Sequence, residues 1–181
     1  MNKIKTLANT IVNYSLNLKE NSKVLVNFSQ VATPLVEEII KEAEKVGAIV
    51  VLNMSDPKLN ARLAEKNTEA RLEHLKKIKE FEVMNYDAFV MIRSGVNDYE
   101  AKNVPPEMTK KFGAMTQELD DIRINEREWV LLNYPTDLDA HKAKMTTAEF
   151  NEFAFDVMTV DYKKMNENIQ PLKELMERTD K

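Results

Sequence analysis

The sequence predicts a three-layer α/β domain with about four mostly parallel strands and with helices on both faces of the sheet. Short apolar runs alternate along the chain with longer segments in which apolar residues recur every three or four positions, a pattern typical of strand–helix–strand units. No internal repeat, low-complexity tract or Gly/Ser linker interrupts this pattern, so we expect a single domain over residues 1–181. The expected strands cover residues 23–28, 48–52, 87–93 and 129–132.

The first two helices show the clearest periodicity. Residues 3–19 carry one apolar stripe, which consists of Ile4, Leu7, Ile11, Tyr14 and Leu18. Residues 33–46 begin with Thr33 as the predicted cap and Pro34 as the first helical residue, where its missing N–H has no cost. Gly47 is the predicted C-terminal cap. The face of this helix that we expect to be buried consists of Leu35, Val36, Ile39, Ile40, Ala43 and Val46.

The later helices are placed by periodicity and by cap patterns. Thr146-Thr147-Ala148-Glu149 fits a capping box, with Phe150, Phe153, Ala154 and Val157 at helical spacing behind it. Trp129 lies inside an apolar run before Pro135, which favours a buried core anchor over a pocket wall. Further helices are expected at residues 57–64, 68–81, 107–119, 146–157 and 162–178, with a short acidic helix after Pro135 and an extended loop over residues 94–106.

Composition excludes several classes of function. The net charge is −4, with acids and bases interspersed, so the chain lacks the basic footprint of a nucleic-acid-binding protein. It has no cysteine, which removes thiol nucleophiles, disulfides and thiolate metal sites. No apolar run approaches the ~20 residues that a membrane-spanning helix needs. The first residues read as an amphipathic helix rather than a signal peptide, and we therefore expect a cytoplasmic protein.

The side chains that could bind a metal do not form a ligand set in the sequence. His74 lies in a helix rich in lysine and glutamate, where a solvated position is the simplest interpretation. Asp137 and His141 would share a helix face, whereas Asp139 would point away from it. Acidic residues early in a helix are also expected from the helix dipole. We therefore predict no catalytic, cofactor-binding or metal-binding residue in this chain.

Other polar groups favour ordinary surface or core positions. The clusters Lys76-Lys77-Lys79 and Lys110-Lys111 are surrounded by glutamates, as on a solvated face. Ten methionines are scattered along the chain, which favours core filling over an adaptable groove. Ser29 and Thr33 follow the first strand, where doubly wound sheets usually bind ligands. No two of the three glycines lie in one loop, which argues against nucleotide binding there.

One stretch carries a family resemblance. The matching residues are Arg127, Trp129, Tyr134-Pro135-Thr136, Ala140, Ala143, Met145, Glu149, Phe150 and Phe153. Together they resemble the signature of the thermophilic metalloaminopeptidases, the aminopeptidase T and aminopeptidase S type of leucyl aminopeptidase. The sequence departs from this signature at Lys144, Thr146 and His141, where the family usually has Gly, Ser and Gln. None of these positions is a metal ligand in the family.

The resemblance continues through the first half of the chain and implies a function. A metal-dependent aminopeptidase of this kind removes N-terminal amino acids from peptides with two divalent ions, such as zinc or cobalt, and is a homodimer. The family's ligands lie in a C-terminal half. The chain therefore resembles the N-terminal domain alone, without the catalytic domain, and we expect it to be inactive by itself. Two alternatives remain: a stand-alone module that binds a small molecule or nucleotide, and a structural interaction domain.

Overall fold

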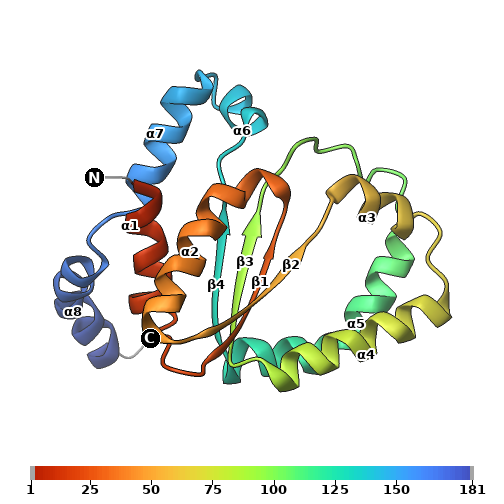
Figure 1. Ribbon diagram of the computed structural model, residues 1–181, viewed down its shortest axis with the longest axis horizontal. Helices are drawn as coiled ribbons and strands as arrows, with labels where there is room; N and C mark the ends of the chain where they lie inside the picture. Colours follow the sequence, from red (N-terminus) through yellow and green to blue (C-terminus); the bar gives the residue numbers. More distant parts are fainter. Residues whose placement is uncertain (1–2, 180–181) are drawn as a thin grey trace.

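Four parallel strands form the centre of the computed structural model, which describes residues 3–179 (Figure 1). Residues 1–2 and 180–181 of the expected domain lie outside the described part. The strand order is β2-β1-β3-β4, and every neighbouring pair is parallel, as predicted. The strand bounds are Lys23–Phe28 for β1, Ile49–Met54 for β2, Ala88–Arg93 for β3 and Glu128–Asn133 for β4.

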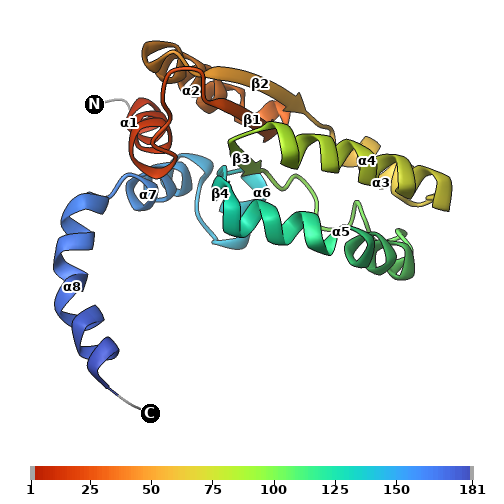
Figure 2. The ribbon, with the colours of Figure 1, turned by 90° about the horizontal axis from the view of Figure 1, so that it is seen from below.

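Helices connect the strands and cover both faces of the sheet, which confirms the three-layer α/β class. Figure 2 shows α1, α2 and α7 on one side of the strands and α4 and α5 on the other. The α-helix bounds are Lys3–Asn9 for α1, Thr33–Val46 for α2, Pro57–Ala64 for α3, Glu69–Asn85 for α4, Pro106–Glu126 for α5, Asp137–Lys142 for α6, Thr147–Met158 for α7 and Tyr162–Arg178 for α8. A π-helical segment, η1, covers Thr10–Ser15, and a short 3-10 helix, η2, covers Gln30–Ala32.

The hydrophobic core is divided unequally by the sheet. Alternate residues of β1 and β3, such as Val26 and Val90, point to the larger core under α1, η1 and α2. The predicted buried face of α2 lies in this core, where Leu35 and Ile39 are completely buried. The opposite face has a smaller core, made of Leu25, Val83, Phe89 and Leu119. The face covered by α4 and α5 is therefore only partly closed by apolar packing.

The prediction that Trp129 is a core anchor is wrong. β4 is an edge strand of the sheet, and the Trp129 side chain on it is 42% exposed. Its indole Nε1 donates a hydrogen bond to the Ile124 carbonyl, at 3.2 Å. An apolar run looks the same in a central strand and in an edge strand, so the residue pattern alone does not distinguish the two.

Several predicted helix boundaries also need correction. The helices α4 and α5 extend to Asn85 and Glu126, past the expected ends at residues 81 and 119. The N-terminal helix changes to π-helical geometry at Thr10 and ends at Ser15, rather than continuing to residue 19. The N-cap residue of α2 is Ala32, and Thr33 is already the first helical residue. The Thr33 hydroxyl donates to the Gln30 carbonyl, at 2.7 Å, and does not cap the helix. Gly47 ends α2 in the left-handed conformation, with φ of 74°, as predicted.

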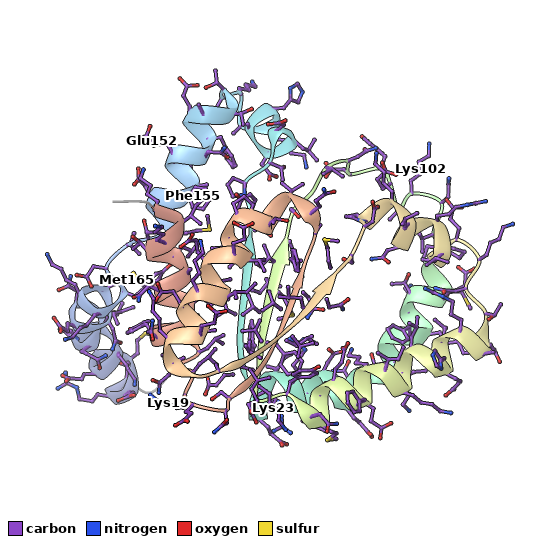
Figure 3. The ribbon with its side chains drawn as sticks, in the orientation of Figure 1. Lys19, Lys23, Lys102, Glu152, Phe155 and Met165 are labelled. Carbon is purple, nitrogen blue, oxygen red and sulfur yellow. The ribbon has the colours of Figure 1, made fainter. Side chains whose placement is uncertain are left out.

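The last helices differ in how they contact the rest of the protein. Phe155 of α7 is buried in the larger core at the contact with α1 (Figure 3), and it packs edge-on against Tyr134. In contrast, α8 has no buried residue, and Figure 2 shows it extending away from the sheet. Within residues 3–179, no helix has both the length and the apolarity needed to cross a membrane.

Candidate functional site: the groove beside β4

The segment that carries the family resemblance folds as one continuous unit, β4–α6–α7. Tyr134 extends the pairing of β4 with β3, because its backbone N–H donates to the Arg93 carbonyl at 2.7 Å. Pro135 then ends the strand, since it has no N–H to donate. Thr136 begins α6 directly afterwards. The signature therefore fixes a sharp change of direction at the carboxyl end of the edge strand.

Two capping boxes hold this turn and the next one. Thr136 and Asp139 bond reciprocally at the start of α6, with the Thr136 N–H 3.1 Å from the Asp139 carboxylate. Thr146 and Glu149 repeat the arrangement at the start of α7, as the sequence predicts, with the corresponding distance 2.9 Å. These hydrogen bonds from Thr146 lower the pKa of Glu149. The first capping box was not predicted, although Thr136-x-x-Asp139 carries the same signal with Asp in place of Glu.

An apolar groove lies between this unit and the N-terminal helix. Its volume is about 470 Å³. Phe153 and Val157, expected on the inner face of α7, are 56% and 53% exposed along it. The apolar residues along the groove are Leu7, Ile11, Val130, Leu131, Leu132, Pro135, Phe150, Phe153, Ala154, Val157 and Met158. Such a surface can bury apolar side chains of another molecule.

The described residues along the groove include two side chains that can carry a proton, Asp139 and Tyr162. The Asp139 carboxylate already accepts two hydrogen bonds from Thr136. The neighbouring Asp137 accepts a hydrogen bond from the Thr147 hydroxyl, at 2.9 Å, and so ties α6 to α7. These acidic residues therefore stabilise helix ends and the turn between them.

The described residues do not fit a divalent metal centre of the kind that the family uses. His74 is exposed on α4, and His141 is exposed on α6. No group of three or more His, Asp or Glu side chains within residues 3–179 could hold a metal ion together. The carboxylates nearest His141 in sequence, Asp137 and Asp139, are engaged by threonine hydroxyls and a backbone amide.

A polar cluster that the sequence did not reveal lies on the opposite face of the sheet. Lys79 of α4 binds Asp120 of α5 at 2.6 Å and the Thr116 hydroxyl at 3.0 Å. Arg123 lies 3.3 Å from the same aspartate. Burial acts to raise the pKa of Asp120, but the bonds from Lys79 and Arg123 outweigh it and hold that pKa below its usual range. Lys79 and Asp120 are 41 positions apart in the sequence, and they meet because α4 packs against α5.

Ser29 and Thr33, which follow the first strand in the sequence, do not point to a common site in the structure. Ser29 is buried at the carboxyl end of β1, and its hydroxyl contacts that of Ser94 beyond β3. Thr33 instead turns back to the Gln30 carbonyl. The lysines at positions 76, 77, 110 and 111 remain on helix surfaces, as expected, whereas Lys79 joins the polar cluster.

Comparisons with known proteins relate this chain to a family and to a solved structure. The solved structure of wild-type AmpT from Thermus thermophilus matches this chain with a TM-score of 0.67 and 14% sequence identity. That match covers 87% of this chain and 42% of the AmpT chain, in its N-terminal part. A comparison with curated proteins finds no match. The family model described as "Thermophilic metalloprotease (M29)" matches residues 1–181, and the chain therefore belongs to this family of metallopeptidases.

Proposed function

We propose that this chain serves as the amino-terminal, non-ligating domain of a metal-dependent aminopeptidase. The observation that carries the proposal is the family match over residues 1–181, combined with a structural match to less than half of the AmpT chain. The parent enzyme would remove N-terminal amino acids from peptides, with two divalent ions such as zinc or cobalt held outside this domain. Its cytoplasmic location stays a prediction.

The role of the domain in that enzyme is assembly and control of access to the active site. The groove beside β4 supports this role, because Phe153 and Val157 expose apolar side chains there without a chemical group of their own. A surface of this composition is suited to contact with other protein surfaces. We propose that the enzyme is a homodimer and that this domain contributes to holding it together.

The test of the non-ligating role is a metal titration. Metal-stripped protein is titrated with zinc and with cobalt in a calorimeter, and hydrolysis of a leucyl amide is then assayed. We expect no tight stoichiometric binding and no turnover, because a peptidase metal needs several fixed ligands and an open position for water. His74→Ala serves as the matched control for His141→Ala.

Two results would contradict the proposal. The first is submicromolar binding that His141→Ala abolishes and His74→Ala preserves, which would place a ligand set around α6. The second is metal-dependent turnover by the purified chain. For the assembly role, sedimentation of the chain as a monomer at all concentrations would count against its contribution to a dimer.

A further inference from the structure

The connections between the strands create a crevice at the carboxyl end of the sheet. From β1 the chain passes through α2 to β2 at one edge, whereas β3 continues through α5 to β4 at the other edge. The two connections diverge between β1 and β3. In open parallel sheets, ligands bind in the crevice that forms at such a point. The same strand order, 2-1-3-4, occurs in flavodoxin-like folds, where the ligand lies between β1 and β3.

A cavity lined by both polar and apolar residues occupies this position. Its volume is about 390 Å³, and its lining includes Ser29, Ser55, Arg93, Ser94 and Gly95. Ser29 and Ser94 are only 8% and 9% exposed, and their hydroxyls bond to each other. Two hydroxyls carry two hydrogens, and the bond between them uses one. The other hydrogen remains for a ligand, since neither hydroxyl makes a further hydrogen bond within residues 3–179.

The charges around the cavity favour an anion. Arg93 is among the lining residues, and its guanidinium makes neither an ion pair nor a hydrogen bond with any residue from 3 to 179. Asp56 is the nearest acid in sequence to Ser55, and one of its carboxylate oxygens accepts hydrogen bonds from the amides of Lys58 and Leu59 at the start of α3. The helical segment after Ser29 has no acidic residue in its first turn, so its positive end is uncompensated.

The cavity continues along the sheet beneath α4 and α5. A second cavity of about 520 Å³ shares Asn27 and Met91 with the first. Asn53 donates to Asn27 at 2.8 Å, which leaves the amide nitrogen of Asn27 and the amide oxygen of Asn53 available. Lys79 and Arg123, of the polar cluster described above, stand at the far side. The two cavities thus lie side by side at Asn27 and Met91, and we call them together the trough.

We propose that this trough binds a small phosphorylated molecule, with the phosphate group against Ser29, Ser94 and Arg93 and the rest of the molecule over Asn27 and Met91. Phosphate offers several strong acceptor oxygens to donors that converge from different directions. Serine hydroxyls and a guanidinium here take the place of the glycine-rich loop that the sequence lacks. The site does not depend on the peptidase reaction and would make the chain a ligand-binding module as well.

The test is a titration followed by nuclear magnetic resonance. The chain has three glycines, so the Gly95 amide beside the crevice and the Gly47 amide at the opposite end of the sheet are easily assigned reporters. The probes are ribose 5-phosphate, AMP and inorganic phosphate. Ribose and malonate serve as the unphosphorylated and the carboxylate comparisons. We expect the phosphorylated probes to shift Gly95 and to leave Gly47 in place.

Variants connect the binding to the named groups. Arg93→Gln should weaken ribose 5-phosphate at least ~10-fold, since it removes a charge-assisted contact. The double change Ser29→Ala with Ser94→Ala should weaken it by a similar factor. Lys163→Gln removes an exposed charge on α8 and should leave the affinity unchanged. Thermal melts without ligand check that each variant is folded, and Arg93 is exposed, so its variant is expected to fold.

Three outcomes would overturn the proposal. One is the absence of any Gly95 shift with phosphorylated probes up to about 10 mM, beyond which binding is too weak to be specific. Another is equal affinity for malonate and ribose 5-phosphate, which would remove the preference for phosphate. The third is unchanged affinity in Arg93→Gln, which would place the ligand elsewhere on the surface.

Discussion

Threonine side chains fix the course of the chain after β4. Thr146 accepts a hydrogen bond from the Glu149 amide and donates to its carboxylate, so two backbone donors at the start of α7 are satisfied reciprocally. Thr136 does the same for α6. Because Glu149 is exposed, its contribution comes from this local geometry rather than from burial.

Thr146→Ala should lower the free energy of unfolding by about 1 kcal/mol, the usual cost of removing a helix cap. Urea melts of the variant and the parent measure the difference. Thr109→Ala, at an exposed position within α5, is the control, and its effect should stay within about 0.5 kcal/mol because alanine is the better helix former. Equal effects of the two changes would show that the cap does not stabilise α7.

Trp129→Ala should cost only about 1 kcal/mol, because its side chain is 42% exposed. The loss consists of partial packing and the hydrogen bond to the Ile124 carbonyl. Leu35→Ala, at a completely buried position, should cost about 2–5 kcal/mol and provides the comparison. A Trp129→Ala cost near that of Leu35→Ala would mean that another molecule covers β4 in solution.

Residue patterns predicted the strands and helices well, because the periodicity of each element depends only on residues that are close together in the sequence. They placed all four strands to within a few residues, and both ends of α3. They did not predict which strands lie at the edges, since β2 and β4 are as apolar as β1. The groove and the crevice follow from strand order and helix packing: Ser29 and Ser94 are 65 positions apart. A local pattern of residues cannot predict that two residues so far apart in the sequence will meet.

Two aromatic side chains of α7, Phe153 and Phe155, are two residues apart and differ strongly in burial. Phe155 packs into the larger core, whereas Phe153 lies on the groove and is 56% exposed. Phe155→Ala should cost about 3–5 kcal/mol, as expected for emptying a large buried site. Phe153→Ala should cost less than about 1 kcal/mol in the same urea melts. Similar losses from both would show that the groove is filled.

Glu82 of α4 is a partly buried carboxyl group on the sheet face that α4 and α5 cover. Burial raises the pKa of Glu82, and the positive charge of Lys79 only partly opposes this effect. A raised pKa in the folded state means that the stability contributed by this group is present below its ordinary pKa of 4.5 and is lost as the pH rises through the folded value.

Glu82→Gln should therefore stabilise the protein at pH 7 and give little gain at pH 4, where the parent carboxyl is also largely protonated. Urea melts at both pH values measure this. Glu80→Gln removes the same charge from an exposed position on α4 and controls for net charge. A gain at pH 4 as large as that at pH 7 would contradict the assignment. The nearby Asp120 carboxyl has the opposite pH dependence. Its pKa is lowered in the folded state, so the stability that it contributes is present at higher pH and is lost as the pH falls.

The molecule as a whole consists of a tightly packed body and one helix with little support. No residue of α8 is buried, Met165 on it is 52% exposed (Figure 3), and Pro171 within it cannot donate a backbone hydrogen bond. We expect its amides to exchange with deuterium far faster than those of β1 and β3, because opening α8 costs little of the total stability. Mass spectrometry of exchanged peptides provides the measurement. Protection of α8 equal to that of β3 would indicate that another surface covers it.

The contact between α1 and α7 has a consequence for how the protein is made. Lys3 pairs with Asp156 at 2.7 Å, and Phe155 completes a core that begins at Leu7. On the ribosome, α1 and α2 emerge before α7 is synthesised. They can pack on each other, but the apolar surface that α7 covers stays exposed until α7 follows. During this interval the nascent chain exposes the surface that molecular chaperones bind. The time that translation takes from the end of α2 to the end of α7 therefore adds to the period in which this surface can aggregate.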